Sequence, residues 1–466
     1  MVTQSLAFTS LTALALVQLG CSEITLVDPR SDRPRTEATL SWTTEPIADV
    51  DASAYDGHGF VVHEWGTDTV VVGSDGSLQR GLHHEQEDLP AFVYDRVSGG
   101  KATPESSVEV KMETPVTYFY SDVPRKVTAA VAFPRGVFTQ WYPAVQRFTP
   151  AIIGPTSGGA STAWHDPVFD LTTPFNSEQC RADYTSVADG LLDWGEVEVL
   201  DRAAAPALSD APLDEFTWSF ARDVASNPVR FASAPGGAQA EKFLFYRGLG
   251  NFELPVTVTA EVGGVVRVAN HYGAAIPRAF LIHVDGDRGA FVTTAAPLAP
   301  ASSIEGQVPS LDDAADLDSF ATTLGEEVEK AIDATGLYHD ESVAMVNTWK
   351  RQWFRTPGTR VLYLIPQAWT DSSIPLTISP TPAKTVRMMM IRVEILSPEL
   401  EASDVEAAKR LADPGTAPAG EAHFVALGRF AEPRLRRALA LAGDPQLGAS
   451  FLRDIESADT RGMSGE

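Results

Sequence analysis

The strongest constraint on the fold is a regular alternation of apolar and polar residues between positions 254 and 294. Four short segments show this alternation, and turn sequences such as Gly263-Gly264 and residues 285–287 separate them. An apolar residue at every second position gives a strand one face that belongs in a core. Short strands that recur about every ten residues are typical of a β sandwich. We therefore predict an immunoglobulin-like sandwich for this stretch.

The residues before this stretch also favour strands. Positions 60–65 and 67–72 lie on either side of a single glycine and are rich in β-branched and aromatic residues. Such residues fit the pleated surface of a sheet, and similar segments continue to residue 142. We predict an N-terminal β-rich domain over residues 57–240 and an immunoglobulin-like β domain over residues 241–396.

Two helical regions interrupt or follow the strands. Apolar residues at positions 317–332 recur at intervals of three or four, which predicts an amphipathic helix. A second helix is predicted at residues 340–354, and the two helices are expected to form a hairpin inserted at residues 311–355. Ser397-Pro398 is an N-cap followed by proline at the first helical position, and it opens a helical segment over residues 397–466. The predicted fold class is mainly β within an α+β chain, with β-sandwich domains, a helical hairpin insertion and a small C-terminal helical unit.

The N-terminus has the layout of an export signal. A short apolar run ends in Gly20-Cys21, and it is too short to remain as a transmembrane helix. We predict a signal peptide over residues 1–20 and lipidation of Cys21, as in bacterial lipoproteins. A signal that is cleaved without lipidation and a buried apolar segment are the alternatives. Polar residues 21–56 are predicted to form a tether, and the expected location is the cell envelope, as an outer-membrane or periplasmic lipoprotein.

The chain is strongly acidic, and this restricts its partners. It contains 36 lysines and arginines against 62 aspartates and glutamates, for a formal net charge of −26. The resulting field repels nucleic acid and anionic lipid headgroups. We expect no nucleic-acid partner, membrane contact through the N-terminal lipid alone, and an envelope polymer or protein as the remaining class of partner. With Cys21 lipidated, Cys180 is the one cysteine left, so no disulfide is expected.

Motifs of familiar enzymes are missing from the sequence. It has no G-x-S-x-G nucleophile turn, no complete phosphate loop or dinucleotide turn, and no H-E-x-x-H zinc motif. Each of these motifs places the groups that its chemistry needs. Their absence argues against the common hydrolase, kinase and dehydrogenase folds, and we expect no cofactor.

Two carboxylates and one arginine are the candidates for catalysis. Glu64 and Glu113 lie in or beside predicted strands, and two carboxylates about 5–10 Å apart can act as an acid and base pair. Arg247 follows an apolar strand, a position suited to binding a carboxylate or another anion. The alternative for all three residues is a structural role in ion pairs.

Three aromatic residues are candidates for ligand binding. Trp65, Trp141 and Tyr142 lie in or next to predicted strands, and aromatic ring faces stack on sugar rings. The alternative is that they anchor the core, which is the usual role of large aromatic side chains.

Histidines are weak candidates for metal ligands. His83 and His84 stand before Glu85 in a polar stretch, and His63 lies in a predicted strand. A metal site would require three of these four residues to meet at one point. The alternative is a solvated surface run, and our prediction is that no metal is bound.

Several strings in the chain resemble one protein family. They include HEWGTDT (63–69), KMETPVTYFY (111–120), FLFYRGLGNF (243–252) and VNTWKRQWF (346–354). Over residues 58–440 the chain resembles an uncharacterised family of exported bacterial proteins with E-W-G-T-x-T and K-M-E-T-P-V-x-Y-F-Y motifs. Asp68 stands where that pattern has an aromatic residue. The resemblance implies export and implies no particular chemistry.

Two functions remain in view. The first is an exported, lipid-anchored cell-envelope protein with a binding or structural role and an unknown ligand. The second is an envelope hydrolase acting on a polysaccharide or peptide, with Glu64 and Glu113 as the carboxylates and Arg247 as the substrate clamp. If these three residues line one open cleft, the enzyme hypothesis gains support. If they are sealed in ion pairs, it loses support.

Overall fold

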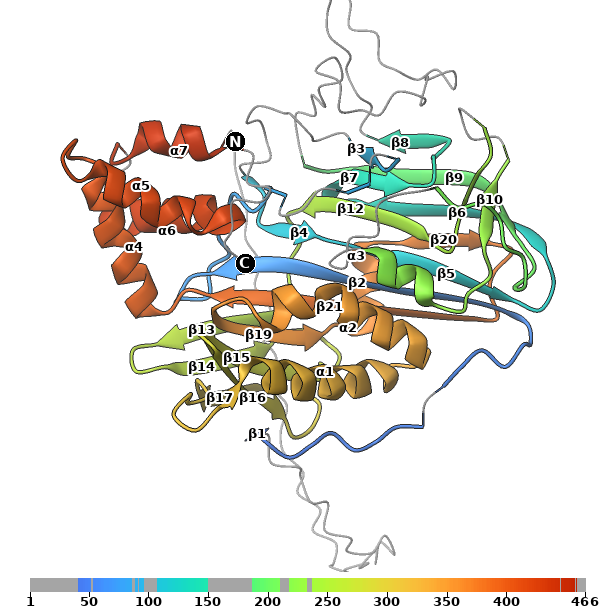
Figure 1. Ribbon diagram of the computed structural model, residues 1–466, viewed down its shortest axis with the longest axis horizontal. Coiled ribbons are helices and arrows are strands. Elements are labelled where there is room, and N and C mark those ends of the chain that lie inside the picture. Colours follow the sequence, from blue (N-terminus) through green and yellow to red (C-terminus); the bar gives the residue numbers. More distant parts are fainter. Residues whose placement is uncertain are drawn as a thin grey trace, which may run out of the picture. The chain divides into compact units, whose positions relative to one another are not determined.

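Figure 1 shows the computed structural model of the protein. The structure describes residues 41–51, 53–85, 89–90, 92–95, 107–149, 187–209, 218–232, 237–444, 446–456 and 458. All of them belong to one compact unit that extends from Leu40 to Glu466. The predicted signal peptide and both cysteines, Cys21 and Cys180, lie outside the described residues.

A sheet of twelve strands forms the centre of this unit. Its members are β1 (Trp42–Thr43), β2 (Phe60–Val72), β3 (Tyr94–Asp95), β4 (Val110–Met112), β5 (Val116–Ser121), β7 (Gly136–Tyr142), β12 (Leu244–Gly250), β15 (Ala279–Asp285), β16 (Arg288–Thr294), β18 (Ala315–Asp316), β19 (Gly358–Leu364) and β21 (Lys384–Ile395). Along the main path the order is β1-β16-β15-β19-β21-β2-β4-β12-β7-β3, while β18 pairs with β16 and β5 pairs with β2 and β12.

The long strand β2 organises this sheet. Its 13 residues are all buried, and it pairs in parallel with β21 over an unbroken register from Val61 and Lys384 to Val72 and Ile395. The two segments predicted on either side of Gly66 are therefore one strand. A Cβ on Gly66 would lie 2.8 Å from the backbone of Pro115, so the glycine permits this close packing.

The predicted domain boundary at residues 240 and 241 needs correction. Strands from both predicted domains alternate within the central sheet, because β2, β4 and β7 pair with β12 or β21. Hydrogen bonds between strands join segments that are hundreds of residues apart, which patterning within each segment cannot reveal. The described residues therefore form one unit and not two β domains.

A second sheet of six strands packs against the first. It contains β6 (Arg125–Phe133), β8 (Arg147–Thr149), β9 (Gly190–Val199), β10 (Val229–Phe231), β11 (Gln239–Glu241) and β20 (Leu376–Ser379). Trp194 of β9 contacts Tyr246 of β12 with ring centroids 6.3 Å apart. The predicted class, mainly β with a sandwich-like arrangement and helices, is confirmed.

The four strands predicted between residues 254 and 294 are present but belong to two sheets. The first two, β13 (Val256–Glu261) and β14 (Val265–Asn270), form a three-stranded sheet with β17 (Ser303–Gln307). The next two, β15 and β16, pair with each other inside the central sheet. The prediction of four strands is thus confirmed, whereas the stretch does not form a separate sandwich of its own. Alternation predicts strands but does not specify their partners.

The helical hairpin is confirmed within the predicted insertion. It consists of α1 (Leu317–Asp333) and α2 (His339–Phe354), which lie against the central sheet (Figure 1). Phe320 and Leu324 of α1 are buried, as the apolar spacing predicted. The side chain of Asp316 accepts a hydrogen bond from Ser319 N and caps α1. Two further short helices, η2 (Trp218–Asp223) and α3 (Gln367–Ser373), were not predicted.

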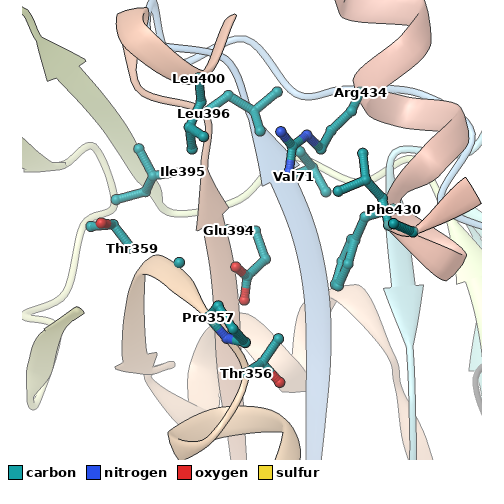
Figure 2. A pocket seen from close by; sticks show the side chains of 13 residues that line it. Val71, Thr356, Pro357, Thr359, Glu394, Ile395, Leu396, Leu400, Phe430 and Arg434 are labelled. Atoms are coloured by element: carbon teal, nitrogen blue, oxygen red, sulfur yellow. The ribbon is translucent and has the colours of Figure 1, made fainter. Parts of the chain in front are cut away.

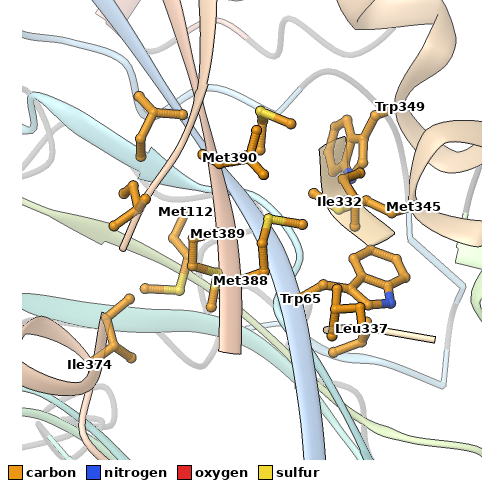
Figure 3. Close-up of a cluster of buried hydrophobic side chains, with 14 of the residues drawn as sticks. Trp65, Met112, Ile332, Leu337, Met345, Trp349, Ile374, Met388, Met389 and Met390 are labelled. Carbon is orange, nitrogen blue, oxygen red and sulfur yellow. The ribbon is translucent and has the colours of Figure 1, made fainter. Parts of the chain in front are cut away.

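Apolar side chains pack on both faces of the central sheet (Figure 3). Trp65 of β2 and Met388 of β21 lie with Met345 and Trp349 of α2 on one face, and Met389 lies on the other. Neighbouring residues of a strand point to opposite faces. Because both faces are covered, even the polar residues of β2 are buried, and each of them then needs a polar partner.

The C-terminal helical unit is confirmed and has a small core of its own. It comprises α4 (Pro398–Arg410), α5 (Ala417–Val425), η3 (Gly428–Phe430), α6 (Ala431–Ala442) and α7 (Ala449–Glu456). The Ser397 hydroxyl accepts a hydrogen bond from Leu400 N at 3.3 Å and caps α4, as predicted. None of the helices in the described part of the chain has the length and apolarity needed to span a membrane.

The tether predicted over residues 21–56 extends too far, because its C-terminal part belongs to the folded unit. Trp42 and Thr43 pair with β16, and Ile47 and Tyr55 are buried in the main core. The backbone N–H of Ile47 donates to a carboxylate oxygen of Glu327 in α1. Contacts with distant strands and helices order these residues, although their own sequence is polar and lacks a periodic pattern.

Candidate functional site

Glu64 is the centre of a buried ion pair. It lies on β2 directly beside Arg387 of β21. Arg387 Nε donates to its Oε2 at 2.7 Å, and Nη2 lies 2.6 Å from the same oxygen in the ion pair. The hydroxyls of Tyr246 and Thr117 donate to Oε1 at 2.6 and 3.0 Å. The side chain of Glu64 is fully buried. Its oxygens are thus satisfied by protein groups and have no access to a substrate.

Glu113 and Arg247 belong to a second buried network. Glu113 forms an ion pair with Arg429 of η3, while Arg247 donates to the backbone carbonyl of Glu113 at 2.6 Å and to Glu85 at 2.6 Å. Burial by itself would raise the pKa of Glu113, but Arg429, Lys111 and Arg247 together lower it to about 2. Glu113 is therefore an ionised structural carboxylate at neutral pH.

This arrangement gives the hydrolase hypothesis no support. Glu64, Glu113 and Arg247 are 0, 2 and 7% exposed, and each contacts a different oppositely charged residue. A general acid or base must reach the proton that it transfers, and these side chains face protein groups instead. The alternative interpretation, structural ion pairs, accounts for their positions.

The three aromatic candidates lie inside the core. Trp65, Trp141 and Tyr142 are 1, 0 and 2% exposed. The Tyr142 ring packs against Phe92 in a tilted arrangement, with ring centroids 4.7 Å apart, and its hydroxyl forms a hydrogen bond with Ser209 at 2.7 Å. Stacking on a sugar requires an exposed ring face, so these residues serve as core anchors among the described residues.

Asp68 is a buried acid without a hydrogen-bond partner among the described residues. It lies on β2 between Met112 and Ile391. Burial, with a smaller contribution from the charge of Glu113, raises its pKa well above the ordinary value. Its surroundings on the strand therefore offer its carboxylate no compensating polar group among the described residues.

Two of the histidine candidates meet, and the third does not join them. His63 is fully buried and bonds to Glu341 of α2 at 2.7 Å. His83 and His84 lie side by side with ring centroids 4.1 Å apart, and both contact Glu432 of α6. Glu85 instead pairs with Lys111 and Arg247, so Glu432 takes the position that Glu85 was expected to hold.

A groove of a size suited to a ligand lies between the central sheet and the C-terminal helical unit. It is a pocket of about 580 Å³, a size typical of small-molecule sites. Most of its wall is apolar, and Figure 2 shows Phe430 and Arg434 on the helical side facing Glu394 and Thr356 on the other. We call this groove the sheet–helix pocket; its further lining residues are Val71, Pro357, Gly358, Thr359, Ile395, Leu396, Leu400, Ala426 and Leu427.

Polar groups stand at fixed points of this apolar wall. Arg360 and Arg392 both donate to Oε1 of Glu394, at 2.7 and 2.6 Å, and together they lower the pKa of Glu394 to about 2 although burial opposes this shift. Arg434 donates to Asp404 from Nε and Nη2 at 2.8 and 2.7 Å. The buried Thr356 hydroxyl has no hydrogen-bond partner in the described part of the chain.

Sequence reasoning did not identify the residues of the sheet–helix pocket. They come from the end of β21, the turn before β19 and the C-terminal helices, and no motif connects these segments. One signal was available: the R-V-E alternation at residues 392–394 places Arg392 and Glu394 on one face of a predicted strand. Glu432 had no such signal, because it appears in the sequence as an ordinary residue of a helix first turn.

Comparisons with known proteins add little. No family model matches the chain, and no curated protein matches its sequence. Among solved structures, the chain is similar to the yeast delta-COP-I mu-homology domain complexed with a Dsl1 WxWxV peptide, with 6% identity, a TM-score of 0.25, and 72% of this chain and 96% of that domain covered. The same yeast domain alone gives 6% identity and a TM-score of 0.24, with 73% and 98% covered. No functional argument rests on likenesses this weak.

Proposed function

We propose that this chain is an exported, lipid-anchored cell-envelope protein that binds an apolar ligand with an anionic group in the sheet–helix pocket. The volume and apolar wall of the pocket carry the proposal, since most small-ligand sites combine such a wall with a few fixed polar groups. Nη1 of Arg434 is not used in its two bonds to Asp404, so it is available to a ligand anion.

Filling the pocket is expected to weaken ligand binding without unfolding the protein. Ala426 lines the pocket and is exposed, so Ala426→Trp places an indole in the cavity without replacing a core residue. The probe is 8-anilinonaphthalene-1-sulfonate, which has an apolar body and one anionic group. We expect at least about a tenfold loss of dye affinity in a fluorescence titration, equal to about 1.4 kcal/mol.

Two further variants make this test specific. Ala440→Trp adds the same side chain at an exposed position of α6 outside the pocket lining and should bind the dye normally. Arg434→Gln should weaken the sulfonate dye but leave the neutral analogue N-phenyl-1-naphthylamine unaffected. Equal dye affinity of Ala426→Trp and the unaltered protein would contradict the proposal that a ligand binds in the sheet–helix pocket.

The lipid anchor is tested separately. Cys21→Ser removes the thiol that would carry the lipid, and we expect the protein to move from the membrane fraction to the soluble fraction. A lipoprotein is anchored in the membrane by several acyl chains, and each buried methylene contributes about 0.8 kcal/mol to membrane binding. The unaltered protein should therefore stay in the membrane fraction during a salt wash. Fractionation and immunoblotting measure the change. Continued membrane association of Cys21→Ser after the wash would contradict the anchor.

A further inference from the structure

His83, His84 and Glu432 meet at a junction between the central sheet and the C-terminal helical unit. The two histidines follow Gly81, whose backbone has a φ of +99°. A Cβ at Gly81 would lie 2.5 Å from a carboxylate oxygen of Glu432, so the glycine permits the close approach of α6. Glu432 stands in the first turn of α6 and is fully buried. The fold thus brings three potential metal ligands together from two distant segments.

The distances among the three ligand atoms suit a single ion. Nε2 of His83 and Nε2 of His84 lie 2.8 and 3.0 Å from Oε2 of Glu432, and all three atoms are within 4.8 Å of one another. Zinc takes histidine nitrogen and carboxylate oxygen at about 2.0–2.2 Å in tetrahedral geometry, which separates neighbouring ligand atoms by roughly 3–3.5 Å. Small side-chain movements therefore suffice to admit the ion.

Neighbouring residues already hold the three ligands in place. Arg436 donates to Oε1 of Glu432 at 2.7 Å, which leaves Oε2 directed at the two rings. Lys111 donates to the backbone carbonyl of His84 at 2.6 Å and so holds the backbone beside the rings. Such outer contacts orient the ligands of metal sites. Arg436 also forms an ion pair with Glu456, which offsets part of its positive charge near an incoming cation.

We propose that Nε2 of His83, Nε2 of His84 and Oε2 of Glu432 bind one divalent transition-metal ion of the zinc class. Water supplies the fourth ligand, because three protein atoms leave one tetrahedral position open. Each neutral ring binds the ion through Nε2 and carries its single proton on Nδ1, so the ion replaces the two hydrogen bonds to Glu432. The ion would connect the segment after β2 to α6 and stabilise the docking of the helical unit.

The test is a zinc titration of the full chain after removal of metal with a chelator. We expect one Zn²⁺ per chain by calorimetry and a higher melting temperature with zinc, because a ligand that binds only the folded state stabilises it. His84→Gln and Glu432→Gln should each weaken zinc binding at least about 100-fold. His58→Gln, which changes an exposed histidine, should bind as the unaltered chain does.

A second measurement on the unaltered chain does not depend on folding of the variants. Co²⁺ in place of zinc should give the visible absorption of a four-coordinate site. Absence of stoichiometric binding, unchanged binding in both variants, or a Co²⁺ spectrum without four-coordinate bands would each overturn the proposal, leaving the three side chains as a hydrogen-bonded cluster.

Discussion

Glu64→Gln is expected to lower the free energy of unfolding by about 3 kcal/mol. The substitution keeps the size of the side chain and its polar atoms but removes the charge opposite Arg387, whose side chain is 1% exposed. Breaking a buried ion pair from one side costs about 3–5 kcal/mol, because the remaining charge stays buried without compensation. The lower end applies here, since Arg387 keeps its contact with Asp371 at 3.0 Å.

Urea unfolding at neutral pH measures this effect. The matched control is Glu253→Gln, because the Glu253 side chain is 91% exposed and its contact with Arg135 is long, at 3.7 Å; we expect a change of less than about 0.5 kcal/mol. The double variant Glu64→Gln with Arg387→Met should lose less stability than the two single variants added together. A loss below about 1 kcal/mol for Glu64→Gln would contradict the assignment of Glu64 and Arg387 as a structural ion pair.

Acid is expected to unfold the protein as the pH falls from about 4.5 toward 2. Glu113, Glu394 and Glu432 each have a pKa lowered from 4.5 to about 2, because arginine or histidine partners outweigh the opposing effect of burial. A carboxyl whose pKa is lower in the folded state stabilises the fold above its unfolded pKa. That stability is lost as the pH falls through the folded value.

The slope of stability against pH gives the size of this effect. Each group contributes about 1.4 kcal/mol per pH unit in the window between its two pKa values, so the three together contribute at most roughly 4 kcal/mol per unit. Across the whole interval between the unfolded and folded pKa values, the stability lost is comparable to the free energy of unfolding of an ordinary domain. Denaturant unfolding at several pH values between 5 and 2 measures the slope.

One variant identifies the contribution of a single group. Glu113→Gln removes one titrating carboxyl. The slope of the unfolding free energy against pH should therefore fall by about 1.4 kcal/mol per pH unit between pH 4.5 and 2. Glu253→Gln should leave this slope unchanged. Asp68 has the opposite sign, because its raised pKa favours the fold at low pH and disfavours it as the pH rises. A stability that stays flat between pH 4.5 and 2.5 would contradict the lowered pKa values.

Elements with a strong local pattern were predictable. The stripe that includes Phe320 and Leu324 predicted α1, and Ser397-Pro398 predicted the start of α4, since capping and helix periodicity depend on neighbouring residues. Residues 42–55 had no such pattern, and contacts with β16 and α1 order them. The division into two β domains was wrong for the same reason, because the pairing of β2 with β21 joins residues more than 300 positions apart.

The candidate sites followed a similar rule. Sequence reasoning selected Glu64, Glu113 and Arg247 as notable charged residues beside strands, and it kept ion pairing open as their alternative role. It could not select Arg387 and Arg429 as their partners, since the parallel register of β21 and the docking of η3 determine those contacts. Charge at a strand position is visible in the sequence, whereas the neutralising partner is a tertiary property.

The main strands, the helical hairpin and the C-terminal helices, together with the acidic balance of the chain, could be read from the amino-acid sequence. These properties depend on residues that are neighbours along the chain. Three further features required the folded chain: the burial of Glu64 beside Arg387, the cluster of Glu432 with His83 and His84, and the pocket between the sheet and the C-terminal helices. Those outcomes depend on strand register and helix docking, which local periodicity does not encode.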